Sequence, residues 1–311
     1  MRPSNRVVIV GAGNVGSSIA YCLISNELSK EILMIDIADD LVNAQVLDMQ
    51  DSCNFTKGIT VRKGDYCDLE DGDIVVITCG AAQKPGQTRL DLLKINAKII
   101  RSVLDKIKET EKNVFILMVT NPVDVLTYIA IKESGLPTNQ VFGSGTFLDS
   151  ARLRVVLARK LGIGTTSTHA HVLGEHGDTS FPSLSTASVS SIPLSNFIEI
   201  NDQTYSKITE EVRDKAYEII KGKQATYYGI GSAVTRIVEA ILKDENRIMP
   251  LCTLLDGEYG HKDVAISVPV RIGSSGVKIF KEMTLSNREK AMFTHSVDVL
   301  KKNIKSLESA S

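Results

Sequence analysis

The sequence predicts an α/β fold in which a Rossmann-type doubly wound parallel sheet is followed by an α+β domain. Apolar runs of strand length alternate with amphipathic helical segments through the first half, a pattern typical of strands buried on both faces of a parallel sheet. The pattern changes near residues 143–148, after which helical segments come first and apolar strands with intervening turn residues follow. We therefore predict two domains, residues 1–145 and residues 146–311.

Each expected element follows from its local pattern. In the first domain the predicted strands and helices alternate, with strands at 7–10, 31–36, 74–78 and 114–119 and helices at 14–28, around 41–49 and at 90–108. In the second domain we predict helices at 148–160, 203–221, 225–242 and 285–307, and strands at 247–255, 264–272 and 277–280. The dipeptide Asp256-Gly257 predicts the turn between the first two of these strands.

Composition excludes several classes of protein. The 311 residues include 36 basic and 37 acidic side chains, so no net positive charge favours nucleic acid or an anionic membrane surface. No apolar run approaches the roughly 20 residues that span a bilayer, and the N-terminus lacks a signal-peptide pattern. The five cysteines are odd in number and form no CxxC motif, which indicates reduced thiols, a cytoplasmic location and no metal site.

A glycine-rich motif predicts a dinucleotide site. The residues Gly11, Gly13 and Gly16 form a GxGxxG pattern, with Asn14 and Val15 inside it, between a predicted strand and a predicted helix. Asp36 follows about 20 residues after the last glycine, at the end of the next strand. Its carboxylate would accept from a ribose 2′-hydroxyl and repel a 2′-phosphate, so we predict NAD rather than NADP as the cofactor.

A second group of residues predicts proton transfer beside an anion site. His176 lies in the glycine-flanked segment Gly174-Glu175-His176-Gly177, and an imidazole titrates near neutral pH. Asp149 and Arg152 are three residues apart on one predicted helix, so their side chains share a face. A proton carrier, a carboxylate to orient it and a guanidinium to bind an anion indicate hydride transfer to a small keto acid.

Four separated motifs occur in one order along the chain, and together they carry a family resemblance. They are the loop at residues 80–91, the segment Thr120-Asn121-Pro122-Val123-Asp124, the pair Asp149 and Arg152, and the segment Glu175-His176-Gly177-Asp178. With them the chain resembles the L-lactate dehydrogenases of the lactate/malate dehydrogenase family over essentially its whole length. The resemblance implies reversible hydride transfer between NADH and pyruvate, giving L-lactate.

The resemblance also implies residue roles. His176 would protonate the carbonyl oxygen of pyruvate, Asp149 would hold the imidazole, and Arg152 would bind the substrate carboxylate with two parallel hydrogen bonds. Arg89 would polarise the carbonyl as its loop closes. Further substrate residues would be Gln83, Asn121, Asp124 and Thr226, and further cofactor residues would be Tyr66, Gly80, Ala81, Val119, Asn121, Ser144 and Ile230.

Substrate choice depends on residue 83 in this resemblance. Malate dehydrogenases generally have an arginine there for the second carboxylate of oxaloacetate, whereas Gln83 is neutral and favours pyruvate. Gln224 replaces a glycine that is commoner before Ala225, so a larger 2-keto acid stays open. The alternatives are an L-2-hydroxyacid or malate dehydrogenase of the same family, and a catalytically silent NAD-binding protein.

A second anion site is implied on the other side of the helix that carries Arg152. Arg154 lies about 200° around the helix from Arg152, so it cannot share the same pocket. In bacterial relatives an arginine matching Arg154 and a histidine matching His169 bind fructose 1,6-bisphosphate across a subunit interface. The resemblance therefore implies a homotetramer with this effector, while His171 is expected to be a strand residue.

Overall fold

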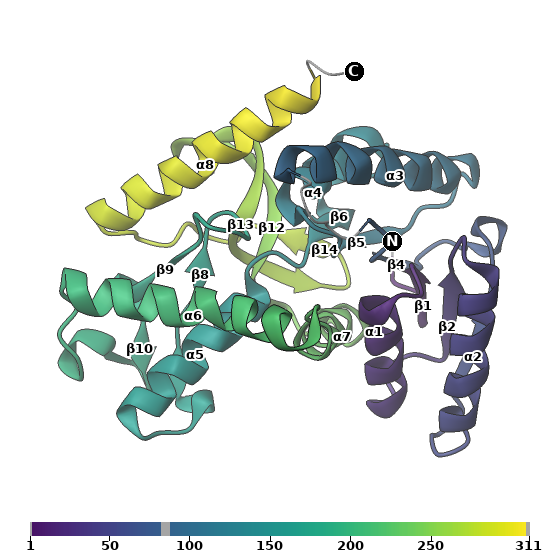
Figure 1. Cartoon of the computed structure of the whole chain (residues 1–311), viewed down its shortest axis with the longest axis horizontal. Coiled ribbons are helices and arrows are strands. Elements are labelled where there is room, and N and C mark those ends of the chain that lie inside the picture. Colours follow the sequence, from purple (N-terminus) through teal and green to yellow (C-terminus); the bar gives the residue numbers. More distant parts are fainter. Residues whose placement is uncertain (1, 82–87, 309–311) are drawn as a thin grey trace.

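The computed structural model describes residues 2–81 and 88–308. Its centre is a nine-stranded sheet in the order β14-β13-β12-β6-β5-β4-β1-β2-β3 (Figure 1). Six strands are parallel, and their order is that of a doubly wound dinucleotide-binding sheet. These strands are β1 (Arg6–Val10), β2 (Glu31–Ile35), β3 (Thr60–Lys63), β4 (Ile74–Ile77), β5 (Phe115–Met118) and β6 (Val141–Gly143).

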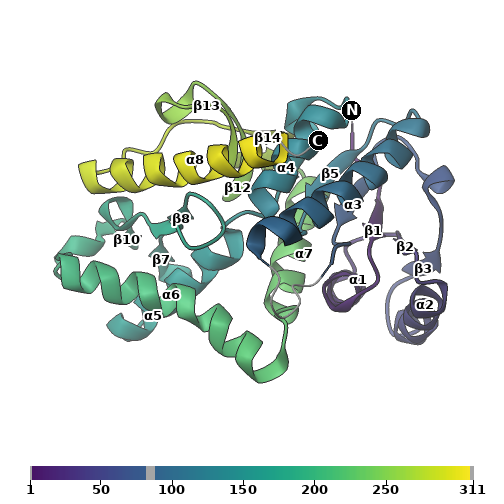
Figure 2. The same cartoon turned by 45° about the horizontal axis from the view of Figure 1, so that its top comes forward.

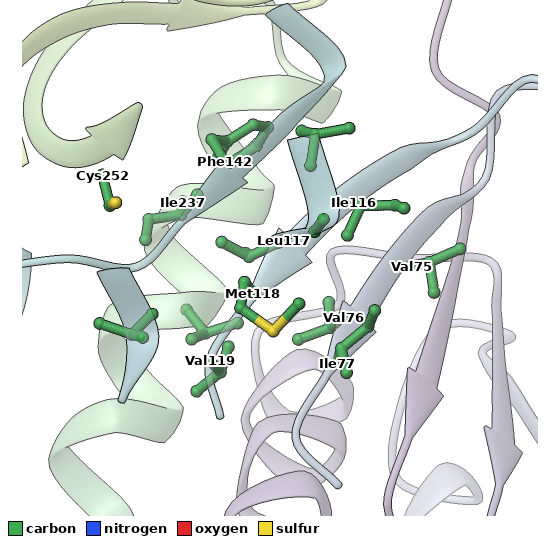
Figure 3. Close-up of a cluster of buried hydrophobic side chains, with 14 of the residues drawn as sticks. Val75, Val76, Ile77, Ile116, Leu117, Met118, Val119, Phe142, Ile237 and Cys252 are labelled. Atoms are coloured by element: carbon green, nitrogen blue, oxygen red, sulfur yellow. The ribbon is translucent and has the colours of Figure 1, made fainter. Parts of the chain in front are cut away.

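Helices cover both faces of this parallel region. Helices α1 (Asn14–Ser25) and α2 (Asp39–Cys53) lie on one face, and α3 (Arg89–Glu109) and α4 (Val123–Glu133) lie on the other (Figure 1). The strands therefore bury both faces, and their side chains fill the core between the helical layers (Figure 3). Residues Val75, Ile116, Leu117 and Met118 have no exposed surface, as the continuous apolar runs predict.

The second half contributes three antiparallel strands to the same sheet. Strand β12 (Arg247–Asp256) joins β6 through the pair Cys252 and Gly143, and β13 (Lys262–Gly273) and β14 (Gly276–Lys278) follow. Five short strands form two small sheets: β7 (Thr168–His169), β8 (Val172–Leu173), β9 (Phe181–Pro182), β10 (Ser188–Val189) and β11 (Ile192–Pro193). The helices are α5 (Phe147–Leu161), α6 (Asp202–Lys223), α7 (Tyr228–Leu242) and α8 (Asn287–Glu308).

The structure confirms the predicted fold class and corrects several elements. Strand β3, helix α4 and strand β6 were not predicted. Helix α4 lacks an amphipathic pattern because nearly all of its residues are buried, so its period of 3.6 residues is hidden. Helix α7 begins at Tyr228, three residues later than expected, because Gln224 ends α6 in a left-handed conformation. His171 lies between β7 and β8 rather than in a strand.

The end of α6 stores backbone strain. Gln224 occupies the C-cap with φ of 67°, a conformation that costs a residue with a Cβ about 1–2 kcal/mol relative to glycine. We expect Gln224→Gly to raise the free energy of unfolding by about 1 kcal/mol, measured by denaturant titration. The matched control is Gly162→Ala at the C-cap of α5, where φ is 66° and no atom lies within 4 Å of an added Cβ. Gly162→Ala should lower the free energy of unfolding by a similar amount. If both substitutions changed this free energy in the same direction, the account would be contradicted.

Candidate active site

The glycine motif forms a cradle at the start of α1. Gly11 has φ of 111°, and a Cβ on Gly16 would lie 1.8 Å from the carbonyl oxygen of Gly11, so neither position accepts a side chain. A Cβ on Gly13 would meet no atom within 4 Å, which leaves open space at the N-terminus of the helix. Asn14 and Val15 begin α1 there, where free backbone N–H groups and the helix dipole favour phosphate. These residues therefore fit the pyrophosphate of a dinucleotide.

Asp36 is fixed at the end of β2, next to this cradle. Its Oδ2 accepts a hydrogen bond from Ala12 N at 2.6 Å, and its Oδ1 accepts one from Ala38 N at 2.8 Å. Tyr66 lies nearby: burial raises the pKa of its hydroxyl, and the negative charges of Asp65 and Asp36 raise it further. The carboxylate and the aromatic ring thus lie where the sequence predicts the ribose side of the cofactor site.

A buried asparagine joins two of the predicted motifs. Asn96, on α3, accepts a hydrogen bond from Ala81 N at 2.8 Å and donates one to the carbonyl of Asn121, also at 2.8 Å. It therefore ties the Gly80-Ala81 segment to the segment that carries Asn121. This residue was not predicted from the sequence. The available signal was a polar side chain on the apolar face of a helix, and Asn96 is only 1% exposed.

The remaining predicted cofactor residues lie at the ends of the central elements. Val119 directly follows β5, Ser144 follows β6, and Ser144 N donates to Met118 O at 2.9 Å. Ile230 lies in α7, which packs against α1, the helix of Val15. A Cβ on Gly231 would lie 3.2 Å from Ser18, so the two helices approach closely. Helix α7 from the second half thus completes the surroundings of the cradle.

The predicted proton carrier and its carboxylate are in direct contact. His176 Nδ1 lies 2.6 Å from Asp149 Oδ2, and the carboxylate is buried while the imidazole is 29% exposed. Burial lowers the pKa of His176, but the charge of Asp149, the hydrogen bond to it and the charge of Asp124 outweigh burial and raise this pKa to about 9. The contact uses Nδ1, so Nε2 is the atom that can exchange a proton with a substrate.

Arg152 lies beside this pair and borders two cavities. Its Nη1 donates to Asp149 Oδ1 at 2.9 Å, which leaves Nη2 and Nε available for a carboxylate. A cavity of about 620 Å³ is lined by Asn121, Asp149, Arg152 and His176 among others. A second cavity of about 580 Å³ is lined by Arg152, Thr226 and neighbouring residues of α6 and α7. Arg152 therefore connects the predicted catalytic pair with the segment that carries Thr226.

The loop that carries His176 is anchored on both sides. Gly174 exchanges two backbone hydrogen bonds with Ser267 of β13, each of 3.2 Å. Ser296 of α8 donates to the carbonyl of Thr179 at 2.7 Å. Figures 1 and 2 show β8, which leads into this loop, between α8 and α6. Ser267 and Ser296 were not predicted from the sequence, because their roles depend on contacts between distant segments.

Two predicted substrate residues lie wholly or partly outside the described residues. Gln83 lies outside the described residues, and so does the side chain of Arg89. The backbone of Arg89 begins α3, where a capping box explains the start of the helix: Thr88 accepts from Asp91 N at 3.1 Å and the Asp91 carboxylate accepts from Thr88 N at 3.3 Å. Asp124 is buried and does not line either of the two cavities that Arg152 borders.

Basic side chains gather on the other side of α5. Arg154 lines neither cavity, and among the described residues no acidic side chain pairs with it. Burial lowers the pKa of Arg154, and the charge of Arg247 lowers it further. Burial also lowers the pKa of His171 to about 4, with added effects from Arg154 and His169. Arg154, Arg247, His169 and His171 therefore lie close enough together for their charges to influence one another.

Within residues 2–81 and 88–308 the chain contains no cluster of three or more His, Cys, Asp or Glu side chains arranged to hold a metal ion. None of the helices in these two ranges combines the length and the apolar character needed to cross a membrane.

Comparisons with known proteins agree with this geometry. The family model for the lactate/malate dehydrogenase NAD-binding domain matches residues 5–143, and the model for the alpha/beta C-terminal domain matches residues 146–310. An L-lactate dehydrogenase 1 of Bacillus cereus is 45% identical over 306 residues, covering 96% of this chain and 97% of the relative.

Two solved structures have nearly the same fold. A lactate dehydrogenase from a Medee basin deep-sea metagenome library has a TM-score of 0.94 and 40% identity, with 99% of this chain and 100% of that chain covered. A minor L-lactate dehydrogenase from Enterococcus mundtii, in a ligand-bound form, has a TM-score of 0.94 and 38% identity, with 98% of each chain covered. The chain therefore belongs to the lactate/malate dehydrogenase family and binds NAD through its first half.

Proposed function

We propose that this chain is an NAD-dependent L-lactate dehydrogenase that interconverts pyruvate and L-lactate. The observation that carries the proposal is the 2.6 Å contact between His176 and Asp149 in one cavity with Arg152 and Asn121. A single cavity thus offers a proton at His176 Nε2 and a guanidinium for a carboxylate. NADH, when bound at the Gly11–Gly16 cradle, supplies the hydride.

Each side chain has a separate task in this proposal. Arg152 binds the carboxylate of the 2-keto acid and so fixes the carbonyl relative to His176. The imidazolium donates its proton to the carbonyl oxygen, and the Asp149 carboxylate stabilises the imidazolium before that transfer. In the reverse direction the neutral imidazole accepts the hydroxyl proton of L-lactate. Arg89 polarises the carbonyl, Asn121 hydrogen-bonds near it, and Gln83 and Thr226 border the methyl group of the substrate.

A substrate panel with the purified wild-type protein tests this function. We expect NADH to be oxidised fastest with pyruvate, more slowly with oxaloacetate or branched 2-keto acids, and NADPH to be a poor substitute because Asp36 repels a 2′-phosphate. The product should be the L enantiomer. Preference for oxaloacetate or for a branched acid would support another dehydrogenase of the family, and binding of NADH without turnover would support a catalytically silent protein.

The proposal also includes the domain boundary, the cellular location and the oligomeric state. We place the boundary of the two domains at residues 145 and 146, and the matched ranges of the two family models support it. All five cysteines are free, which is in accord with a reducing cytoplasm, where the enzyme would serve fermentative glycolysis. A homotetramer would bring the basic side chains around Arg154 to a subunit interface.

Fructose 1,6-bisphosphate is the proposed effector at this basic site. Two observations support this assignment. The basic side chains of Arg154, Arg247 and His169 lie close together, and two phosphate groups would relieve the repulsion among them. In addition, His171 Nδ1 is buried and has no hydrogen-bond partner among the described residues. An effector of this kind acts only if it binds one state of the enzyme more tightly than another.

We expect fructose 1,6-bisphosphate to lower the KM for pyruvate and to increase the fraction of tetramer. A tenfold preference for the active state corresponds to about 1.4 kcal/mol per site. In Arg154→Gln this activation should disappear, so that the activities measured with and without bisphosphate become equal. Steady-state kinetics and sedimentation with millimolar bisphosphate provide the measurement. A wild-type protein whose KM and sedimentation both stay constant would show that these basic residues serve another purpose.

A further inference from the structure

The segment between α6 and α7 carries Thr226 and turns the chain from one helix into the other (Figure 2). Backbone hydrogen bonds hold it at its two ends: Gln224 N donates to the last turn of α6, and the carbonyl of Tyr227 accepts from the first turn of α7, each at 2.8 Å. Between these ends, Ala225 and Thr226 form no hydrogen bond with any other residue in the ranges 2–81 and 88–308. The position of Thr226 therefore depends on contacts of another kind.

A lysine side chain spans this segment. Lys223 is the last residue of α6, and its Nζ lies 3.2 Å from the ring centroid of Tyr227 and 4.0 Å from that of Tyr228. The two ring centroids are 4.5 Å apart, so one ammonium group interacts with both π-systems. Gln224, with φ of 67°, turns the chain so that residues four and five positions after Lys223 return to it. The ammonium thus closes the segment into a loop.

This loop forms part of the wall of the second cavity that Arg152 borders. Lys223, Tyr227 and Tyr228 all line that cavity of about 580 Å³. Thr226, which the loop encloses, lines it as well. A shift of the loop would therefore change the space between Thr226 and Arg152. In the proposed function, that space receives the group attached to the keto carbon, because Arg152 holds the carboxylate.

The rings are the partners of Lys223 in this structure. No acidic side chain of the described residues forms an ion pair with it, although the side chain is exposed and could extend into water. Lys221 lies in the same last turn of α6, and both lysines have a favourable interaction with the C-terminal end of the helix dipole. Within the described part of the chain only Lys223 of the two contacts an aromatic ring. A comparison of the two lysines therefore isolates the ring contact.

We propose that Lys223 is a specificity-determining residue, whose ammonium holds Tyr227 and Tyr228 and so fixes Thr226 at the distance from Arg152 that suits a methyl group. The side chain acts through the loop and not on the reacting atoms, so it is a positioning residue. This role rests on the proposed function, in which Thr226 borders the methyl group of pyruvate.

The test is the ratio of kcat/KM for pyruvate to kcat/KM for 2-oxobutyrate, which carries an ethyl group in place of the methyl group. Lys223→Met keeps the length of the side chain and removes the charge. We expect this ratio to fall by about 2–5-fold, the effect of a cation–π contact at an exposed site. The change should appear in the two KM values, whereas kcat for pyruvate should stay near that of wild type, because His176 and Asp149 lie on other elements.

Two matched variants separate the ring contact from the charge alone. Lys223→Arg keeps a cation for the rings and should restore the wild-type ratio. Lys221→Met removes the same charge from the same helical turn and should also leave the ratio as in wild type.

A double-mutant cycle with Tyr228→Leu tests whether the lysine acts through the ring, since Tyr228 is 69% exposed and its replacement leaves the core intact. Tyr228→Leu should lower the ratio in the same direction as Lys223→Met. The double variant should lower it by less than the product of the two single effects, because the second substitution removes a contact that is already weakened.

A folded Lys223→Met protein, with the NADH affinity of wild type, that keeps the wild-type ratio would overturn the proposal, even if its stability falls. An equal fall in Lys221→Met would also overturn it, because the effect would then belong to charge at the helix end. If the wild-type protein reduces neither acid, the proposed function fails instead, so the two failures can be told apart.

Discussion

Replacement of His176 with alanine is expected to lower kcat for pyruvate reduction by about 10²–10⁴-fold, the usual contribution of a general acid. The imidazole is the group that Asp149 holds at 2.6 Å in the cavity with Arg152, and alanine offers no proton there. NADH affinity should be nearly unchanged, because the glycine cradle belongs to the first half of the chain. Stopped-flow or steady-state kinetics and NADH fluorescence titration measure the two quantities.

The control for this variant is His295→Ala, which removes an exposed imidazole from α8. Its turnover should equal that of wild type. Turnover of His176→Ala close to the wild-type rate would exclude His176 as the proton donor. Loss of NADH binding in His176→Ala would mean instead that the substitution disturbs the fold, and the kinetic loss could not then be assigned to the proton.

Replacement of Arg152 with lysine is expected to lower kcat/KM for pyruvate by about 10²-fold, mainly through KM. A guanidinium can bind the substrate carboxylate with two parallel hydrogen bonds while a third nitrogen stays on Asp149, and an ammonium cannot reproduce this geometry. The loss of one charge-assisted hydrogen bond costs about 1.5–3 kcal/mol. Because this contact exists before and during the reaction, its loss should appear in KM more than in kcat.

Arg159→Lys provides the control on the same helix, since Arg159 is 70% exposed and pairs with Glu211. It should leave both kinetic constants as in wild type. An Arg152→Lys enzyme with the wild-type KM for pyruvate would place the substrate carboxylate elsewhere.

Local sequence patterns were sufficient to predict the architecture and the placement of Asp149 and Arg152 on one helix. The glycine motif and Asp36 are short-range signals, and the three-residue spacing of Asp149 and Arg152 places both side chains on one helix face. The continuous apolar strands also revealed the parallel sheet. Helix α4 was hidden because burial on all sides removes the amphipathic period, and β3 was missed because it is a short edge strand with Arg62 and Lys63.

Contacts between distant segments could not be predicted from the sequence. Asn96 is 25 residues from the Asn121 carbonyl that it binds, and Asp124 is 52 residues from the His176 backbone that it holds. Sequence reasoning assigned Asp124 to the substrate because of its motif, and only the folded chain places its carboxylate in the interior. Pairing of this kind is set by topology and packing, which leave no period in the sequence.

The central claim is that one imidazole, His176, gives its proton to pyruvate and accepts it back from L-lactate. The most direct test is the pH dependence of kcat/KM in both directions with the wild-type enzyme. Because Asp149 and Asp124 outweigh burial and raise the pKa of His176 to about 9, pyruvate reduction should be constant at neutral pH and fall as pH rises through about 9. Lactate oxidation, which needs the neutral imidazole, should rise over alkaline pH. Profiles that change in the same direction, or a reduction profile with no alkaline decline, would contradict the account.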